Sequence, residues 1–266
     1  MANDDLVLIK GAGDLASGIA WRLVRCGFRV MMTELPHPLA IRRQVAFAEA
    51  VFDGETVVEG ITARLVPDLQ GAGRLVEQCV IPVLIDPAAQ RLAELRPATL
   101  VDAIVAKQNL GTRITDAPLV IALGPGFLAG TDCHAVIETK RGHGLGRVLW
   151  SGSAAPNTGI PGTITGRPAG RVLRAPASGH VIAHVAIGDR VRAGEPVAEV
   201  AGHVITAPFD GVVRGLLHPA VEAWPGLKIG DVDPRGNPAH SLTISDKALA
   251  IAGGVLEAVL SRHNYT

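Results

Sequence analysis

The stretch that decides the fold is "LVLIKGAGDLASGIAWRLVRCGFRVMMTELP", residues 6–36. Its first apolar run, residues 6–9, predicts a short buried strand. Apolar residues then recur with the spacing of a helix face until Gly27, a residue type that commonly ends helices. Residues 28–33 predict the next strand. A strand, a glycine turn, a helix and a second strand form the βαβ unit of a Rossmann-type sheet.

The turn "GAGDLA" matches the dinucleotide-binding fingerprint, with alanine in the place of the third glycine. The first glycine permits the tight turn, the second lets backbone amides approach a pyrophosphate, and the small third residue lets helix and strand pack closely. An acidic residue at the end of the second strand is placed to bind ribose hydroxyls. We therefore expect a nucleotide or another cofactor to bind at Gly11, Gly13, Asp14, Ala16 and Glu34. The carboxylate of Asp14 is unfavourable beside a pyrophosphate unless it points away, so a fold that has lost its nucleotide is the competing interpretation.

The following residues continue to alternate between helix and strand patterns. Helices are predicted at 67–79 and 88–95, and buried strands at 82–85, 99–105 and 119–123. This order is typical of a doubly wound α/β sheet, whose ligands gather at the carboxyl ends of the strands. Polar clusters follow two of these strands. Their candidate cofactor-binding residues are Lys107, Asn109, Gly124, Gly126, Asp132 and His134. We expect these clusters to face the first glycine loop.

The second cluster lies in "LGPGFLAGTDCHAVIETKRGHGLG", residues 123–146, and allows several interpretations. Backbone amides in the glycine-rich part favour a phosphate or a pterin cofactor. A metal site built from Asp132, His134, Glu138 and His143 is less favoured, because their spacing is not a recognised ligand pattern. Two further interpretations are a Cys133 that carries sulfur and a purely structural hairpin.

A second domain of different composition follows a Gly/Pro-rich linker at residues 151–170. "APASGHV" at 175–181 returns as "APFDGVV" at 207–213, which predicts two copies of a few strands. This segment resembles the barrel-sandwich domains that carry biotin or lipoate on a hairpin lysine, but the matching hairpin at 200–204 has no lysine. We predict a Rossmann-like domain at 1–165, an all-β barrel-sandwich-like domain at 166–235, and a helix within 236–266 that returns to the first domain.

Composition excludes several classes of function. The 25 basic residues balance the 25 acidic ones, and aromatic residues are scarce, so nothing predicts nucleic-acid binding. No apolar stretch reaches the roughly 20 residues of a membrane span, and nothing at the start reads as a signal peptide. Three cysteines without a CxxC pair argue against a disulfide framework and against a structural zinc site. We expect a cytoplasmic homo-oligomer that binds a small-molecule cofactor.

The chain as a whole resembles the YqeB-type proteins of the selenium-dependent molybdenum hydroxylase system, distant relatives of the xanthine dehydrogenase accessory (XdhC/CoxI) family. The resemblance runs through "KGAGDLASGIAWRL", "FRVMMTELPHPLAIRRQVAFAEAVFDG", "LVDAIVAKQNLGTRITDAPLVIALGPGFLAGTDCHAVIETKRGHGLG" and "GLKIGDVDPRG". It implies a maturation role for molybdenum hydroxylases and the binding of molybdenum cofactor. It supplies no catalytic residues, and whether the chain is an enzyme stays open.

Three functional hypotheses follow. The first is an accessory protein for hydroxylase maturation that binds a nucleotide, such as NAD(P), or molybdenum cofactor (molybdopterin), with the hydroxylase as its partner. The second is an NAD-dependent oxidoreductase of a small substrate, which the glycine loop and Glu34 favour. It lacks an evident acid–base pair near a hydride path. The third is a non-catalytic scaffold that docks a hydroxylase through the β domain.

Overall fold

A computed structural model describes residues 6–157 and 170–261 of the protein. The chain divides into two compact units: Met1–Pro36, Ala46–Thr158 and Ile244–Thr266 form the first, and His37–Val45 and Gly159–Thr243 the second. The chain thus passes into the second unit and back before its main β segment. Residues 158–169 of the predicted linker, and the predicted boundary at residue 165, lie outside the described residues.

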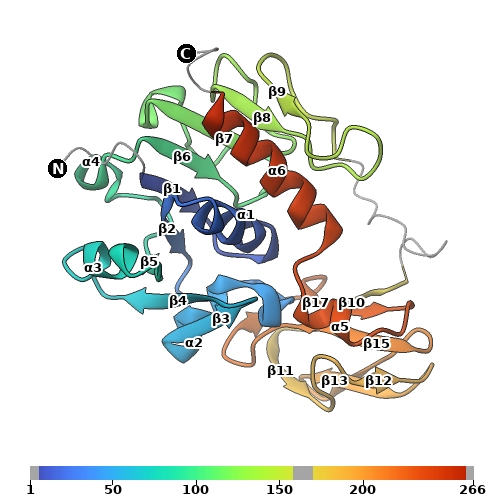
Figure 1. Cartoon of the computed structure of the whole chain (residues 1–266). Coiled ribbons are helices and arrows are strands. Elements are labelled where there is room, and N and C mark those ends of the chain that lie inside the picture. Colours follow the sequence, from blue (N-terminus) through green and yellow to red (C-terminus); the bar gives the residue numbers. More distant parts are fainter. Residues whose placement is uncertain (1–5, 158–169, 262–266) are drawn as a thin grey trace. The chain divides into compact units, whose positions relative to one another are not determined.

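A nine-stranded sheet forms the centre of the first unit (Figure 1), with the order β3-β4-β5-β2-β1-β6-β7-β8-β9. The strands are β1 (Leu6–Lys10), β2 (Arg29–Glu34), β3 (Glu55–Val58), β4 (Ile61–Val66), β5 (Ile81–Ile85), β6 (Thr99–Asp102), β7 (Leu119–Leu123), β8 (Ala135–Ile137) and β9 (Val148–Leu149). All neighbours from β4 to β8 pair in parallel, whereas β3 and β9 pair antiparallel at the two edges.

The order of the strands reverses at β1. After β1 and β2 the chain places β3 and β4 at the far edge and returns to insert β5 beside β2, and it then places β6, β7 and β8 on the other side of β1. The carboxyl ends of β1 and β6 therefore flank a topological switch point, the place where parallel sheets of this kind bind ligands. Gly11 follows β1 at this point, and Ala103 follows β6.

Helices cover both faces of this sheet, as a doubly wound fold requires. They are α1 (Asp14–Arg25), α2 (Ala50–Asp53), α3 (Ala72–Glu77), α4 (Leu92–Leu95) and α6 (Asp246–Leu260). On one face, residues from β1, β6 and β7 form a buried cluster with residues of α3 and α4: Leu8, Leu100, Val120, Ala72, Leu75 and Leu92. Alternate strand residues point to the other face, where α1 and α6 lie side by side (Figure 1). The predicted α/β fold class is confirmed.

The predicted helix at 88–95 is shorter than expected, because it begins at Leu92. The carboxylate of Asp86 accepts hydrogen bonds from the backbone N–H groups of Gln90 (2.9 Å) and Arg91 (3.0 Å). Ala89 has a positive φ of 51°, which is incompatible with a right-handed helix. The Asp86 carboxylate and one left-handed residue thus keep the residues before Leu92 out of the helix.

Small residues allow α6 to pack closely in the first unit. Gly18 of α1 faces Ala248, and Gly253 faces Arg22, so the two helices run parallel with their N-termini together. Gly254 lies against the backbone of Gly146, in the loop between β8 and β9. The two neighbouring glycines of α6 therefore have different surroundings, although both reduce the intrinsic stability of a helix.

The second unit contains two four-stranded antiparallel sheets, ordered β10-β17-β15-β12 and β14-β13-β11-β16. Its strands are β10 (Val172–Arg174), β11 (Gly179–Ala183), β12 (Arg190–Val191), β13 (Pro196–Val200), β14 (His203–Thr206), β15 (Gly211–Leu216), β16 (Glu222–Ala223) and β17 (Lys228–Asp233). A short helix, α5 (Ala239–Leu242), follows the last strand. This all-β region confirms the second part of the predicted fold class.

The sequence repeat relates the two sheets. Each strand of one sheet has its counterpart at the equivalent position of the other: β10 with β14, β17 with β13, β15 with β11, and β12 with β16. Hydrogen bonds repeat in the same way. Gly194 N–H donates to the carbonyl of Ala207, and Gly226 N–H donates to that of Ala175, both at 2.8 Å. The hairpin between β13 and β14 turns at Ala201 and Gly202, both with positive φ, and carries no lysine.

Charged side chains tie the segment His37–Val45 to the rest of the second unit. Arg42 Nη2 donates to the carbonyl oxygens of His240 (3.1 Å) and Thr243 (3.0 Å). Arg43 Nε donates to the carbonyl of Leu216 at 3.0 Å. A guanidinium group satisfies several carbonyl oxygens at once, so this irregular segment holds its place without strand pairing.

Within the described ranges, no helix has the length and apolar character needed to cross a membrane.

The two glycines of α6 give a matched stability test. Gly254→Ala places a methyl group against the carbonyl oxygen of Gly146, and we expect it to lower the free energy of unfolding by about 1–3 kcal/mol. Gly253→Ala meets only the end of the Arg22 side chain at 3.3 Å. It should raise the free energy of unfolding by up to about 1 kcal/mol, because alanine favours the helix. Urea denaturation of both variants measures the difference, and equal effects would contradict this packing.

Candidate functional site

The glycine loop after β1 is held at the switch point by its own backbone. Gly11 has a φ of +90°, and a Cβ there would lie 3.2 Å from the carbonyl oxygen of Ala103. Its N–H donates to the carbonyl of Thr33 at 2.8 Å. Both the left-handed conformation and the close approach require glycine at this position.

Gly13 differs from Gly11 because the space around it is open. It is the N-terminal capping residue of α1, with φ −66° and ψ −179°, and no side chain caps the helix. A Cβ at Gly13 would meet no atom within 4 Å among the described residues. The first N–H groups of a helix lack intrahelical partners and carry the positive end of its dipole. This opening is therefore suited to an anionic group.

Glu34 lies beside this opening. Its Oε2 accepts the N–H of Ala12, and its Oε1 accepts the N–H of Leu35, both at 2.7 Å. Burial raises the pKa of Glu34, while these two backbone hydrogen bonds oppose the rise. A carboxylate has about four acceptor positions, and these two backbone N–H groups use two of them. The structure thus brings Glu34 together with the glycine loop.

Ser17 supports the loop, although no sequence motif pointed to it. It is fully buried in α1, and its hydroxyl donates to the carbonyl of Ala12 at 3.1 Å. The same hydroxyl accepts the N–H of Phe47 at 2.7 Å, and the N–H of Ala48 donates to the carbonyl of Ala12. The segment after β2 is thereby fixed against the glycine loop. Ala16, its neighbour in α1, is 1% exposed.

A buried polar triad joins β1 to β6 beneath the loop. Lys10 Nζ donates to Thr112 Oγ1 at 2.7 Å, and Thr112 donates to Asp102 Oδ2 at 2.6 Å. Lys10 Nζ also lies 3.5 Å from Asp102 Oδ2, and all three residues are buried. Because they are not exposed, they position the edge rather than contact a ligand. Asp102 lies inside the predicted strand 99–105 and ends the observed strand β6, so the sequence did not single it out.

The two predicted polar loops meet at this edge. Gly126 has a φ of +107°, and a Cβ there would lie 2.6 Å from the backbone of Gln108. Lys107 is exposed with a φ of +66°. The Asn109 side chain accepts the N–H of Thr112 and donates to its carbonyl, both at 2.8 Å, so it shapes its own loop. Gly124, with φ +72°, lies against the side chain of Thr139.

Asp132 and His134 lie at the opposite edge of the sheet. His134 precedes β8, and its Nδ1 accepts the N–H of Val120 near the start of β7, at 2.9 Å. Asp132 Oδ2 accepts the N–H of Leu128 at 2.7 Å. In a parallel sheet this amino edge lies about 13 Å along the strand from the carboxyl edge. The structure therefore does not bring Asp132 and His134 together with Gly11 and Gly13.

The same geometry concerns the two other interpretations of residues 123–146, a metal site and a sulfur-carrying Cys133. Glu138 follows the carboxyl end of β8 while His134 precedes its amino end, so the two do not converge on a common ion. Burial lowers the pKa of His134, which keeps its ring neutral. Cys133 is fully buried; burial, with Asp132 and Asp102 nearby, raises the pKa of its thiol to about 12. Cys133 thus lies in the core, and the His134 ring is engaged by the backbone of Val120.

Charged residues gather where α1 and α6 begin. Arg141, from the loop after β8, makes two hydrogen bonds to the carboxylate of Asp246, at 2.7 and 3.2 Å. Lys247 is partly buried, and its electrostatic neighbours include Asp14 and Glu138. Burial, followed by the charge of Arg141, lowers the pKa of Lys247. Asp14 is among the residues predicted from the sequence, whereas Lys247 belongs to a helix that was predicted without a role.

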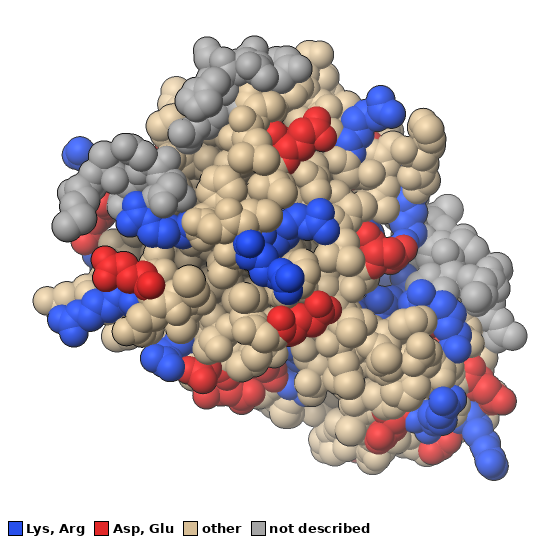
Figure 2. Space-filling view, in the orientation of Figure 1, with Lys and Arg blue, Asp and Glu red and all other residues tan. Residues whose placement is uncertain are grey.

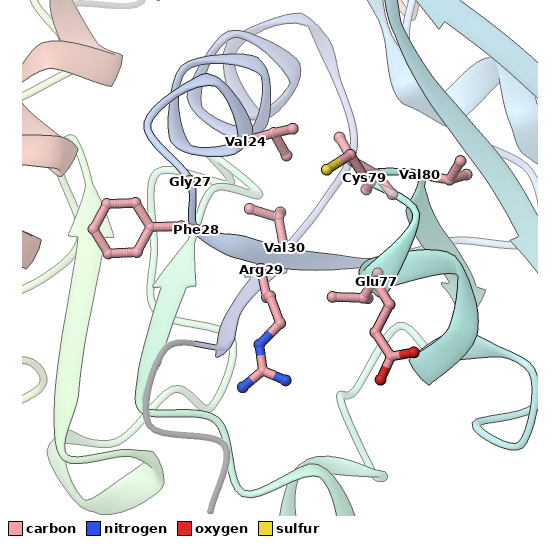
Figure 3. Close-up of a pocket in the computed structure, with 10 residues that line it drawn as sticks. Val24, Gly27, Phe28, Arg29, Val30, Glu77, Cys79 and Val80 are labelled. Carbon is pink, nitrogen blue, oxygen red and sulfur yellow. The ribbon is translucent and has the colours of Figure 1, made fainter.

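A separate pocket of about 210 Å³ lies at the amino ends of β2 and β5 (Figure 3). Val24, Val30 and Val80 contribute to its apolar lining, and Arg29 and Glu77 extend toward the same side. The pocket is thus at the edge opposite to the switch point. On the face drawn in Figure 2, Lys and Arg side chains lie among Asp and Glu side chains.

The fold and this edge define a class: an α/β protein with a Rossmann-type glycine loop and an appended all-β unit. The chain is similar to a protein of Escherichia coli (strain K12) named "Uncharacterized protein YqeB", with 56% identity over 255 residues. The match covers 96% of this chain and 47% of that protein, so the chain spans about half the length of this curated relative. No protein-family model matches the chain, and no solved structure matches it.

Variants of the buried triad test whether Lys10 and Asp102 stabilise the carboxyl edge of the sheet as a charge pair. Asp102→Ala leaves the Lys10 ammonium buried without a carboxylate, and we expect the free energy of unfolding to fall by about 3–5 kcal/mol. The double variant Lys10→Met/Asp102→Leu removes both charges and should regain most of that loss. Urea denaturation compares the three proteins. A double variant no more stable than Asp102→Ala would show that the charges do not act as a pair.

Thiol reactivity tests the assignment of Cys133 to the core. Cys26 and Cys79 are exposed and Cys133 is buried. With Ellman's reagent at pH 8, we expect two thiols to react rapidly and the third only after unfolding, because only a thiolate that the reagent can reach attacks it. The Cys133→Ala variant should keep both rapid phases. Three rapid phases in the native protein would contradict the assignment.

Proposed function

We propose that the carboxyl edge of the nine-stranded sheet binds a phosphate-bearing cofactor, either a nucleotide such as NAD(P) or molybdenum cofactor. The observation that carries the proposal is the open space at Gly13, at the N-terminus of α1 and at the switch point. A group approaching there meets the first N–H groups of the helix, which have no intrahelical partner. Gly11 and Ala16 serve the fold of this loop, and Gly13 would contact the ligand.

The residues present fit such a cofactor. A phosphate suits the N–H groups after Gly13, and hydroxyl groups of a ribose or a pterin side chain suit the two remaining acceptor positions of Glu34. Lys107 is exposed on the adjoining loop, where its charge can reach an anion. Gly124, Gly126 and Asn109 act by shaping that loop. The cofactor would bring its own redox or ligand-transfer chemistry, and these residues bind and orient it.

We further propose an accessory role in the maturation of selenium-dependent molybdenum hydroxylases, with a hydroxylase as partner and a homo-oligomer as the working state. Support comes from the sequence resemblance, which runs nearly end to end. The similarity to YqeB of E. coli supports the YqeB-type assignment within this resemblance. The all-β unit, which lacks the lysine of carrier domains, would serve as a docking module in this role.

An NAD-dependent oxidoreductase is the second candidate. Glu34 favours it, because its carboxylate lies at the end of β2 beside the glycine loop, and dinucleotide-binding folds use an acidic residue at that position for the ribose. The buried triad of Lys10, Asp102 and Thr112 offers no exposed acid or base for proton transfer. Catalytic turnover of NAD with a small substrate would favour this candidate over the accessory role. Binding without turnover, or binding of molybdenum cofactor, would favour the accessory role.

Two matched variants test the site. Gly13 and Gly71 are both helix-capping glycines whose Cβ would meet no atom within 4 Å of the described structure. Gly13→Asp should abolish cofactor binding, a loss of at least about 100-fold, because a carboxylate then occupies the anion position. It should leave the melting temperature unchanged or higher, since Asp is a good N-terminal cap.

Gly71→Asp is the control and should bind as the unaltered protein does. Isothermal titration of the full chain with NAD and NADP, and anaerobically with molybdenum cofactor, measures affinity, and calorimetry measures stability. Unchanged affinity in a folded Gly13→Asp variant would remove the glycine loop from the site. An unaltered protein that binds none of these cofactors would overturn the proposed function.

A further inference from the structure

The pocket at the amino edge of the nine-stranded sheet opens where two neighbouring strands do not pair. β2 pairs with β1 from Arg29 onward, and β5 pairs with β4 from Ile81 onward. Pairing between β2 and β5 begins only at Met32 and Val83. Pro82, the residue before Val83, has no N–H to donate to a ladder. The pocket of about 210 Å³ lies at the first residues of these two strands.

The ends of two helices form the sides of this opening. In both α1 and α3 the residue after the C-terminal cap has a positive φ, +87° at Gly27 and +58° at Cys79. Both residues line the pocket (Figure 3). Cys79 thus takes the position that a glycine has at the end of α1, and it brings a thiol to the wall of the pocket.

Aliphatic side chains form the interior of the pocket. They come from both helices and both strands: Val24, Val30, Val76, Val80 and Ile81. An apolar cavity of about 150 Å³ holds a benzene-sized molecule, whereas drug-sized ligands occupy pockets of about 300–1,000 Å³. The volume therefore suits a short aliphatic chain with a small polar head, and it is too small for a nucleotide.

Two opposite charges lie at one side of the pocket. Arg29 and Glu77 both line it, and their side chains extend toward the same side (Figure 3). A guanidinium group has five N–H donors, so Arg29 can bind a carboxylate in addition to another partner. The carboxylate of Glu77 suits an ammonium group. A ligand with only one of these charges would bring a like charge near either Glu77 or Arg29, which is unfavourable.

We infer that this pocket binds a small aliphatic α-amino acid, such as leucine or valine. The aliphatic chain lies among the valines, Arg29 binds the carboxylate, and Glu77 binds the ammonium group. An α-amino acid carries both charges on one carbon atom, which matches two opposite charges at one side of an apolar pocket. The pocket is at the edge opposite to the glycine loop, so this inference does not depend on the proposed cofactor.

Alkylation of Cys79 reports whether the pocket is occupied. Cys26 and Cys79 are both exposed, but only Cys79 lines the pocket. The full chain is treated with iodoacetamide, and mass spectrometry follows each cysteine separately. Leucine at ten times its Kd leaves about a tenth of the sites free, so alkylation of Cys79 should slow about tenfold. The rate at Cys26 should not change.

Two analogues and one variant test the charges. Isocaproate lacks the ammonium group of leucine and isoamylamine lacks its carboxylate, so each should bind about 10- to 100-fold more weakly, the loss expected for a hydrogen bond between charged groups. Glu77→Gln should weaken leucine binding by a similar factor and strengthen isocaproate binding, because a like charge is removed. Glu257→Gln, which changes an exposed carboxylate in the last turn of α6, is the control and should have no effect.

Three results would overturn the inference. One is a rate of Cys79 alkylation that leucine and valine leave unchanged at about 10 mM, a concentration well above an ordinary metabolite Kd. The second is equal slowing at Cys26 and Cys79, and the third is protection by isocaproate or isoamylamine as strong as that by leucine. None of these results affects the proposed function, because its cofactor titrations measure binding at the other edge of the sheet.

Discussion

The close approach of Gly11 to the backbone of Ala103 is the constraint on which the first unit depends. Because no side chain separates them, β1 and β6 lie together up to their carboxyl ends, and the chain must turn directly into α1. That turn sets Gly13 as the capping residue of the helix and brings the N–H of Ala12 to Glu34. The opening at the switch point is thus a consequence of strand packing.

Distant parts of the chain complete this edge. The triad of Lys10, Asp102 and Thr112 fixes the loop after β6 from beneath, and the loop after β7 packs on it through Gly126. The C-terminal helix then runs beside α1 and adds Lys247 to the same edge. Each contribution depends on a close backbone contact or a buried charge pair. Small structural changes at these contacts would therefore shift the residues around the glycine loop.

The local part of this arrangement could be predicted from the sequence better than the distant part. Gly13 and Glu34 belong to one strand–helix–strand unit, in which spacing alone determines which residues meet. Lys247 meets that unit only through helix packing across most of the chain, which no periodicity encodes. Asp132 and His134 follow a strand that ends at the carboxyl edge, but the connection to the parallel strand β8 returns them to the amino edge. A parallel pair requires such a return, and the sequence alone did not reveal where it ends.

Hydrogen–deuterium exchange of the full chain, with and without a saturating nucleotide or molybdenum cofactor, tests most directly whether the ligand binds at the glycine loop or at the polar stretch around His134. Binding at the glycine loop predicts slower exchange for the amides of residues 12–16. Residues 128–134 should exchange at the same rate with and without the ligand. Protection confined to residues 128–134 would contradict a site at the glycine loop.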